Sequence, residues 1–517
     1  MNKTEEEKSK NRKQKKERKK HPLIKYILLG LVYLLGIIII VLVYWSKKEY
    51  GFRFTEIVYT LTTPLAGADT SIVDGIKSQC IPKIIILFIP YLIWVLIDAV
   101  WGKKLILNRK SKKKPLHLGK LLGIFFTIAC PLVFVVSLVY ANIEYNVFYY
   151  IYSRLQTTEI YEEYYVFPEE TAITIENEPK NLIFIYMESM ETAYLSNSLG
   201  GNQGENLIPN LTDMANEHIS FSNTEGVGGF HSIYGTTWTM GSLFATTTGV
   251  PFAFPVSDNA MGLYKDFASG ITSLGDILQE YGYNQEFLCG SDASFAGRDT
   301  YFSQHGNYEI YDLYTARRNE YIPAGYYVNW GFEDKYLYEI AKDELLELAS
   351  KDEPFNLTML TVDTHFPGGY VCDKCPNKYE TDAKKSIVCA DTQVKEFVDW
   401  CTKQDFYEDT VIIIIGDHPR MDNQLVSNVK FYDRTMYNCI INADAEKDTL
   451  SMTNRIFTAM DVFPTTLAAL GFNIEGDRLG LGTNLFSELP TLAEEIGYKA
   501  LERELEKHSN YYVEQFK

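Results

Sequence analysis

Three long apolar runs stand near the start of the chain, at residues 24–45, 81–101 and 118–140. A helix needs roughly 20 residues to cross the hydrocarbon core of a bilayer, and each run is long enough. The first run exceeds the core of a secretory signal peptide and has no small-residue cleavage site, so we expect it to be retained. A shorter element at 52–66 contains Pro64 and is expected in the membrane interface. The pattern predicts three spans.

The pattern changes after the third run. An acidic, Tyr-rich stretch at 142–178 indicates a linker helix along the membrane surface. From Asn181 onward, short β-branched runs alternate with longer amphipathic ones, which predicts an α/β domain with a mostly parallel central sheet. The clearest strands are continuously apolar and therefore buried on both faces. They lie at 182–187, 356–362 and 411–415, and the expected helices lie at 207–217, 270–281, 335–350, 390–404 and 462–470.

These patterns divide the chain into five parts. They are a basic arm at 1–23, a membrane region at 24–141, the linker at 142–178, the α/β domain at 179–490 and a C-terminal helix at 491–517.

The distribution of charge predicts how the three spans are oriented in the membrane. The net charge is −18, from 49 Lys and Arg against 67 Asp and Glu, yet the basic residues gather at 3–25 and 103–120. Basic loops stay on the cytoplasmic side of a membrane, so the α/β domain is expected outside the cell, carried by a multi-pass cell-membrane protein. A basic arm is also typical of nucleic-acid binding. Here it adjoins a span and anionic lipid accounts for it, so we expect no nucleic-acid partner.

The eight cysteines leave three interpretations open. Four of them cluster in sequence, at Cys372, Cys375, Cys389 and Cys401. A Cys-x-x-Cys pair with later cysteines is compatible with a zinc knuckle, with free thiols or with disulfides, and an external domain favours disulfides.

Two predicted strands end in charged residues. Glu188 follows LIFIYM, and Asp417 and His418 follow VIIIIG. Functional groups gather at the carboxyl ends of parallel strands, and two carboxylates with an imidazole suit a divalent metal ion. Taken singly, Glu188 is equally compatible with a helix cap, and Asp417 with a turn.

A third element lies at 235–251, with the sequence GTTWTMGSLFATTTGVP. Thr239 is predicted to start a helix there. A hydroxyl at a helix N-terminus meets free N–H groups that receive a phosphoryl oxygen, although threonine is also a common cap. A metal ion beside that hydroxyl would make it a nucleophile.

Together these motifs resemble the lipoteichoic acid synthase and phosphoglycerol transferase family, whose sulfatase-like domain belongs to the alkaline phosphatase superfamily. The resemblance covers roughly 181–489 and includes one departure, Thr237 where the family has the second Gly of Gly-x-Gly. The motifs that carry it are IYMES, GTTWT, THFP at 364–367, IIGDH, DVFPTTLAALG at 461–471 and RLGLGTNLF at 478–486. The resemblance implies N-terminal transmembrane helices followed by an α/β/α domain of the alkaline phosphatase type.

The resemblance also implies roles for single residues. Glu188, Thr239, Asp417 and His418 correspond to the ligands of one Mn²⁺ ion, with Mg²⁺ as the alternative, and Thr239 to the nucleophile. His365, in THFP, corresponds to a histidine that holds the substrate phosphate or protonates a leaving oxygen, and Arg298, in FAGRD, corresponds to an arginine that clamps the phosphate. Ala296 replaces a tryptophan common in lipoteichoic acid synthases.

The nucleophile is one of several threonines. Thr239 stands ten residues before Gly249, the spacing of the sulfatase nucleophile, which favours it over Thr236. A true sulfatase needs Cys or Ser at this position, and threonine cannot be converted to the aldehyde.

The predicted function is transfer of glycerol phosphate from phosphatidylglycerol, through a covalent phosphothreonine, to a polyglycerolphosphate chain or surface glycan. Such a metal-dependent phosphotransferase would serve lipoteichoic acid synthesis in the cell envelope. Two alternatives stay open: a phosphoethanolamine transferase acting on a surface glycan or lipid, and a catalytically inactive surface sensor of the same fold.

Overall fold

The computed structural model describes residues 3–63, 71–101, 105–107, 116–255, 266–443, 445, 447 and 450–517. The chain divides into two compact units, which are described separately below. One comprises Met1–Glu49 and Thr70–Phe148, and the other comprises Tyr50–Asp69 and Tyr149–Lys517.

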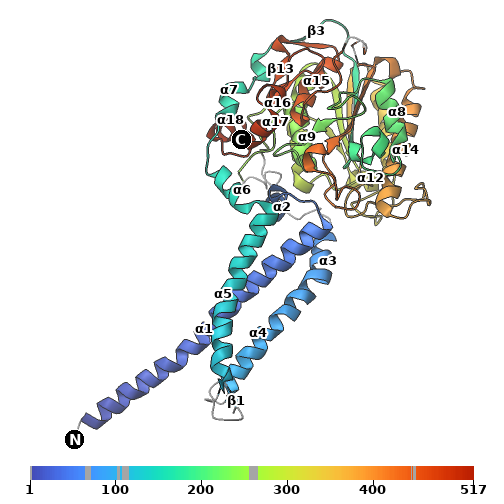
Figure 1. Ribbon diagram of the computed structural model, residues 1–517. Helices are drawn as coiled ribbons and strands as arrows, with labels where there is room; N and C mark the ends of the chain where they lie inside the picture. Colours follow the sequence, from blue (N-terminus) through green and yellow to red (C-terminus); the bar gives the residue numbers. More distant parts are fainter. Residues whose placement is uncertain are drawn as a thin grey trace. The chain divides into compact units, whose positions relative to one another are not determined.

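The first unit is built from three long helices, α1 (Lys3–Glu49), α4 (Ile81–Trp101) and α5 (Leu118–Tyr145) (Figure 1). Short helical segments, α3 (Ser71–Gly75) and η1 (Ile76–Cys80), lead into α4, and a small β1–β2 hairpin (Ile106–Leu107, Leu116–His117) precedes α5. Three helical stretches are long and apolar enough to cross a membrane, which agrees with the three predicted spans. They are Leu23–Glu49, Ile72–Trp101 and Leu118–Tyr145.

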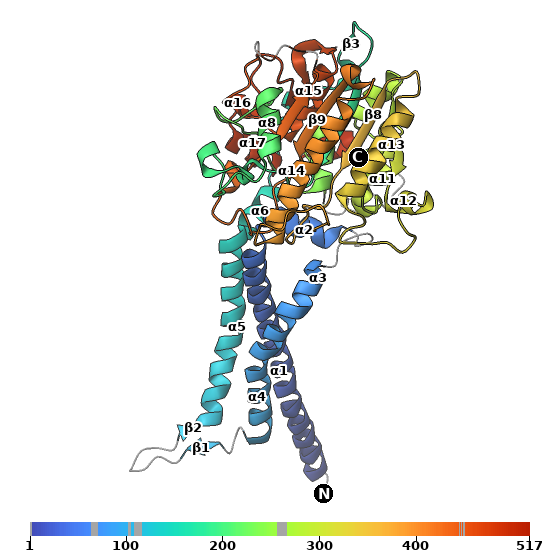
Figure 2. The same ribbon diagram turned by 90° about the vertical axis from the view of Figure 1, so that its right-hand side faces the viewer.

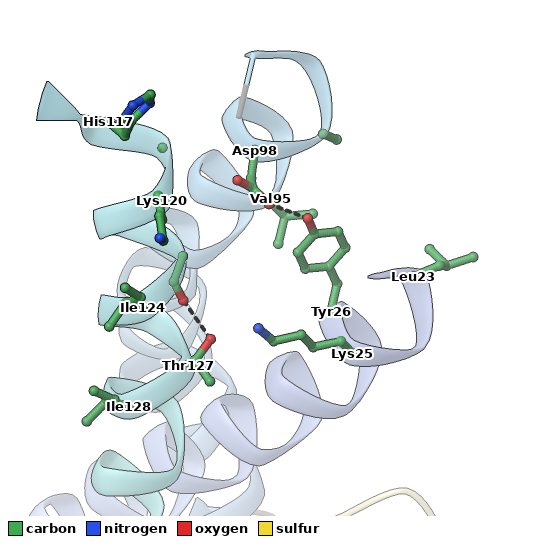
Figure 3. A pocket seen from close by; sticks show the side chains of 13 residues that line it. Leu23, Lys25, Tyr26, Val95, Asp98, His117, Lys120, Ile124, Thr127 and Ile128 are labelled. Carbon is green, nitrogen blue, oxygen red and sulfur yellow. Dashed lines mark hydrogen bonds between the residues drawn. The ribbon is translucent and has the colours of Figure 1, made fainter. Parts of the chain in front are cut away.

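A cavity of about 1160 Å³ opens between these helices (Figure 3). Its lining includes Lys25, Tyr26, Asp98, His117 and Lys120. The Tyr26 hydroxyl donates a hydrogen bond to the Asp98 carboxylate. An acid within an apolar helix therefore has a polar partner inside the bundle, as such groups require.

The second unit is organised around a six-stranded sheet with the order β11-β9-β4-β8-β6-β7. Edge strand β11 is antiparallel to β9, and the other pairs are parallel. The strands are β4 (Asn181–Met187), β6 (Asn284–Cys289), β7 (Glu309–Tyr311), β8 (Phe355–Leu360), β9 (Thr410–Gly416) and β11 (Asn438–Ile441). All three strands predicted from apolar runs lie in the sheet, and every residue of β8 and β9 is buried.

Successive residues of the central strands enter two separate cores. Phe184 and Ile413 belong to the core with α9 (Thr239–Thr248), α10 (Leu274–Glu280) and α15 (Val462–Ala469). Ile183 and Ile412 belong to the opposite core, with α8 (Pro209–Glu217), α13 (Asp334–Leu348) and α14 (Asp382–Cys401). Figure 2 shows α13 and α14 over the face of β8 and β9. The unit is an α/β/α sandwich with a mostly parallel sheet, as expected.

Several boundaries differ from the sequence expectations. Helix α14 starts at Asp382 rather than 390, because the Thr381 side chain caps it by accepting from the Lys384 amide. The stretch 142–178 holds the end of α5 and several short elements instead of one helix: α6 (Val147–Arg154), α7 (Ile160–Tyr164), η2 (Pro168–Glu170) and β3 (Ile173–Ile175). The C-terminal stretch likewise forms α16 (Leu492–Glu495), α17 (Tyr498–Leu505) and α18 (Asn510–Phe516).

The element expected in the membrane interface forms helix α2 (Phe54–Thr62) and belongs to the second unit. Its Tyr59 ring stacks on Trp238 with ring centroids 4.4 Å apart, whereas Leu61 is 79% exposed. Just before α2, the Gly51 amide donates to the Met421 carbonyl at 2.7 Å. One face of α2 therefore packs on the α/β domain. Residues 64–66, with Pro64, lie outside the described residues.

Candidate active site

The candidate site lies at the carboxyl edge of the sheet. Strands β4 and β9 are neighbours in parallel register, with Met187 opposite Gly416, so the next residues, Glu188 and Asp417, leave the sheet side by side. A side chain at Gly416 would collide with the Met190 carbonyl, since a Cβ there would lie 1.8 Å from that oxygen. Only glycine fits at the end of β9, which allows the Met190 backbone to approach the strand closely just before Asp417.

Four predicted side chains converge at this edge. His418 Nε2 lies 3.3 Å from Asp417 Oδ2 and 3.6 Å from Glu188 Oε1. The Thr239 hydroxyl lies 3.2 Å from His418 Nε2 and 3.5 Å from Glu188 Oε2. The three titratable residues are at most 2% exposed. Residues from three distant parts of the sequence thus share one small centre, in which Glu188, Asp417 and His418 are buried and Thr239 is partly exposed.

Hydrogen bonds fix both carboxylates. Asp417 Oδ1 accepts the amides of Ser189 and His418, each at 2.7 Å, and Glu188 Oε1 accepts the Ser189 hydroxyl at 2.6 Å. The Thr364 hydroxyl donates to the Glu188 carbonyl. These contacts leave the remaining carboxylate oxygens directed at His418 and Thr239.

Electrostatics in this centre are unfavourable without a cation. Burial raises the pKa values of both Glu188 and Asp417. The neighbouring Asp417 carboxylate raises the pKa of Glu188 further. Burial opposes protonation of His418, but Asp417 and Glu188 together raise its pKa. Two buried carboxylates this close repel each other when both are ionised.

A divalent metal ion fits this donor set. Asp417 Oδ2 is buried and has no hydrogen-bond partner among the described residues. Ligand atoms of Glu188, Asp417 and His418 all lie within 4.8 Å of one another. Two carboxylates, one imidazole and an adjacent hydroxyl are ligands that Mn²⁺ and Mg²⁺ accept, and Asp417 Oδ2, which accepts no hydrogen bond from the described residues, would be one of the ligand atoms.

Helix α9 distinguishes the two candidate threonines. Thr239 is the first residue of α9, and its hydroxyl faces the carboxylates. Thr236 is 1% exposed, and its hydroxyl donates to the Ile233 carbonyl at 3.0 Å while accepting the Ile233 amide at 2.9 Å. The Thr236 hydroxyl is therefore committed to a turn.

The two residues expected to bind phosphate, His365 and Arg298, both lie beside aromatic side chains. The His365 ring lies 4.4 Å from the Trp330 ring, and Trp330 lies 5.3 Å from Phe295. Burial lowers the pKa of His365, and nearby Glu188 raises it, which places His365 within electrostatic reach of the centre. The Arg298 guanidinium is 5.7 Å from the Phe295 ring centroid, and it donates to the Asp292 carbonyl at 2.7 Å and to the Ser291 hydroxyl at 3.1 Å. Arg298 is the first residue of helix α11 (Arg298–Gln304), and the loop after β6 thus holds its guanidinium.

Sequence reasoning missed a contribution from α2. Glu56 is 5% exposed and accepts the Arg53 amide at 3.0 Å. Burial raises the pKa of Glu56, whereas the Thr237 hydroxyl, Arg53 and His418 lower it. Glu56 in turn is one of the groups that raise the pKa of His418. The available signal was a lone acid, Glu56, in an aromatic, apolar segment.

Two other histidines have structural roles. His231 stacks on Tyr432 at 4.4 Å and bonds the Tyr432 carbonyl at 3.0 Å. His305 lies between Asp276, at 3.0 Å, and the Phe267 carbonyl, at 2.8 Å. Both ring nitrogens of His305 are therefore satisfied by local partners, whereas His231 Nε2 is buried without a hydrogen-bond partner among the described residues.

The disulfides favoured by the sequence are absent. All eight cysteines lie within the described residues and are buried free thiols. Cys372, Cys375 and Cys389 nevertheless gather closely enough to form a second potential metal-binding group.

Comparison with known proteins agrees with this architecture. The Sulfatase family model matches residues 180–472, more than half of the chain. The chain belongs to the sulfatase family. Membership in this family does not by itself assign sulfate-ester hydrolysis to this chain.

Curated relatives are named for a different reaction. The chain is 31% identical to phosphoglycerol transferase I of Salmonella choleraesuis over 335 residues, which is 63% of this chain and 41% of the relative. It is 28% identical to the same enzyme of Salmonella paratyphi B over 443 residues, 83% of this chain and 52% of the relative. The chain thus spans about half the length of these relatives or less.

A solved structure extends the likeness in fold beyond the α/β domain. It is the integral membrane protein lipooligosaccharide phosphoethanolamine transferase A from Neisseria meningitidis, matched with a TM-score of 0.51 and 14% identity over 87% of this chain and 84% of that one. At this identity the match shows a shared fold.

Proposed function

We propose that this protein is a metal-dependent phosphoglycerol transferase that takes glycerol phosphate from phosphatidylglycerol and transfers it to a polyglycerolphosphate chain or surface glycan. The observation that carries the proposal is the Thr239 hydroxyl at the start of α9, within 3.5 Å of both Glu188 and His418. The curated relatives named phosphoglycerol transferase I support the choice of transferred group.

Glu188, Thr239, Asp417 and His418 would hold the metal ion, Mn²⁺ or Mg²⁺. When bound, the ion would favour the ionised Thr239 hydroxyl and neutralise charge on the phosphoryl group. Burial of Glu188, Asp417 and His418 strengthens such electrostatic effects.

Transfer then takes two steps. The Thr239 oxygen attacks phosphorus, the bond from phosphorus to the diacylglycerol oxygen breaks, and that oxygen leaves as diacylglycerol after gaining a proton. An acceptor hydroxyl next attacks the phosphorus of the phosphothreonine ester and gives up its proton, the bond from phosphorus to the Thr239 oxygen breaks, and that oxygen gains a proton and restores Thr239. Arg298 and His365 would bind the phosphate, Arg298 through a charge-assisted hydrogen bond.

The helical unit explains the choice of donor. Three potential spans would keep the centre beside a lipid leaflet. The basic clusters at 3–25 and 103–120 would orient the centre to the outside of the cell, where no nucleotide donor is present.

The test is to trap the covalent adduct. Full-length protein in detergent is incubated with Mn²⁺ and phosphatidylglycerol carrying labelled glycerol, and the peptide containing Thr239 is weighed by mass spectrometry. We expect the added mass of glycerol phosphate on Thr239 together with released diacylglycerol. An adduct of ethanolamine phosphate, formed when phosphatidylethanolamine is supplied instead, would overturn the donor assignment. Metal binding without any diacylglycerol release would favour the inactive sensor.

A further inference from the structure

A second cluster of metal-ligating side chains lies outside the proposed active site. Cys372 and Cys375 belong to the loop between β8 and α14, and Cys389 lies in the first half of α14. Cys372 Sγ is 3.6 Å from Cys375 Sγ and 3.7 Å from Cys389 Sγ. All three residues are buried, at most 8% exposed. Two sequence segments thus bring three sulfur atoms to one point.

The sulfur spacing matches the edges of a metal-thiolate tetrahedron. Around a tetrahedral zinc ion with Zn–S bonds of about 2.3 Å, neighbouring sulfurs stand about 3.8 Å apart. A disulfide requires sulfurs about 2.0 Å apart, and it joins only two of the three. We propose that Cys372, Cys375 and Cys389 bind one zinc ion.

The backbone folds tightly around the sulfurs. The Cys375 amide donates to the Cys372 carbonyl at 3.2 Å, which folds the Cys-x-x-Cys segment into a tight turn. Hydrogen bonds within the group lower the pKa of Cys372 and raise the pKa values of Cys375 and Cys389, and the Lys374 and Cys375 amides also lower the pKa of Cys372. Amide groups directed at a sulfur stabilise its ionised form, the form that binds metal.

Gln393 provides an independent observation. It is 3% exposed, and its Nε2 donates to Cys389 Sγ at 3.4 Å from one turn further along α14. Its Oε1 is buried without a hydrogen-bond partner among the described residues. A buried amide therefore gives its donor to a sulfur, an arrangement typical of the groups that support metal ligands.

The remaining coordination position is left to a water molecule. Among the described residues, the group contains three ligand atoms within 4.8 Å of one another, all of them sulfur. The nearby carboxylate Asp334 accepts the Val362 and Asp363 amides at 2.7 and 3.1 Å and is committed to the backbone. An all-sulfur protein contribution selects zinc over Mn²⁺ or Mg²⁺.

A zinc ion here would close the loop that begins at His365. Within that loop the Gly369 amide donates to the His365 carbonyl at 2.9 Å, and the Tyr370 amide donates to the Asp363 carbonyl at 2.6 Å. Zinc would add a link from Cys372 and Cys375 to α14. The ion is thus expected to order the loop without taking part in the reaction.

Cobalt substitution separates the two metal sites. Thiolate ligands give Co²⁺ an intense near-ultraviolet charge-transfer absorption that carboxylate, hydroxyl and imidazole ligands do not. Full-length protein in detergent is stripped of metal under reducing conditions, loaded with Co²⁺ and titrated with Zn²⁺. We expect the band to appear with one Co²⁺ per chain and to be displaced by Zn²⁺. This readout is independent of the proposed transferase activity.

Variants assign the band to the cluster. Cys372→Ser and Cys389→Ser should abolish it, whereas Cys401→Ser, a buried cysteine on the same helix α14, should retain it. Asp417→Asn should also retain it. For variants that fail to fold, a thiol-modifying reagent added to the wild-type protein should release zinc as the three cysteines react.

Two outcomes would overturn the proposal. One is a protein that shows no thiolate-to-cobalt band and releases no zinc on modification although its three thiols are reduced. The other is an intact mass short of two hydrogens in protein purified without reductant, with a peptide linking two of the three cysteines, which would establish a disulfide instead.

Discussion

Two buried groups of potential metal ligands differ in their donor atoms: one offers oxygen and nitrogen, and the other offers sulfur. Glu188, Asp417 and His418 form one buried group of potential ligands, and Cys372, Cys375 and Cys389 form the other. The first adjoins the Thr239 hydroxyl at the start of a helix, while the second adjoins an amide and backbone N–H groups. Hard ligands beside a nucleophile suit phosphoryl chemistry, whereas soft ligands without one suit a structural ion.

The largest effect on turnover is expected when the Thr239 hydroxyl is removed. Thr239→Ala should lower turnover on the order of ten-thousand-fold, because the covalent route is lost. Unfolding free energy should change by less than about 1 kcal/mol, since Thr239 is not the N-cap residue. Diacylglycerol release and chemical denaturation measure the two quantities.

Thr236→Ala is the matched control. It removes a buried hydroxyl with two local hydrogen bonds, so it should cost about 1 to 2 kcal/mol of stability while turnover persists. The reverse pattern, an inactive Thr236→Ala protein and an active Thr239→Ala protein, would transfer the nucleophile assignment to Thr236.

Removing the metal ion should have the next largest effect. Chelation should abolish turnover, and Mn²⁺ should restore it. Because the pKa values of Glu188 and Asp417 are raised, protons compete with the cation, and its affinity should fall as the pH drops through the raised carboxylate pKa values. Calorimetric titration with Mn²⁺ at several pH values measures this dependence, and an affinity that is independent of pH would contradict it.

In the metal-free protein, the raised pKa values determine how folding stability depends on pH. With the pKa values of Glu188, Asp417 and His418 all raised, the folded chain binds more protons than the unfolded chain. Their contribution to stability is therefore present at low pH and is lost as the pH rises above the ordinary carboxylate range and through the raised pKa values. Asp417→Asn should weaken this trend, and bound cation should counter it. Thermal unfolding with chelator or with Mn²⁺ distinguishes the cases.

Much of the candidate active site could be predicted from sequence, because its residues directly follow predicted strands or begin a predicted helix. Buried strands end at Met187 and Gly416, and parallel pairing forces Glu188 and Asp417 together. Thr239 stands at a fixed spacing from the glycine that ends its helix. These are local signals, and the sheet geometry converts them into a site.

Other parts depend on contacts that no local pattern encodes. The sequence left Cys372, Cys375 and Cys389 open to three interpretations, because spacing does not reveal that a loop folds back on α14. Likewise, α2 has the composition of an interfacial helix, and only tertiary packing against Trp238 places Glu56 beside Thr237. The linker at 142–178 breaks into short elements at Asn146, whose left-handed backbone ends α5.

Glu56→Gln tests whether helix α2 contributes to the group formed by Glu188, Asp417 and His418. Glu56 helps to raise the pKa of His418, so neutralising it should lower that pKa. The acidic limb of the pH profile of turnover should move to lower pH, because His418 then loses its proton more readily, and turnover should change by about tenfold or less, which corresponds to at most about one pKa unit of changed interaction. A shift in the pH dependence of turnover is the decisive readout. Leu61→Ala, on the exposed face of the same helix, should leave that dependence unchanged.

The smallest effect on turnover is expected at the sulfur cluster, and it tests whether the two centres really differ in kind. Cys389→Ser should raise KM for phosphatidylglycerol severalfold while kcat changes little, because loosening the His365 loop weakens substrate binding without touching the nucleophile. Thermal stability should fall as well, since zinc binding contributes to the folded state. Cys401→Ser should leave the KM unchanged. A collapse of kcat in Cys389→Ser protein that still folds and still binds Mn²⁺ would mean that the sulfur cluster takes part in the chemistry, and the division between a reactive and a structural ion would fail.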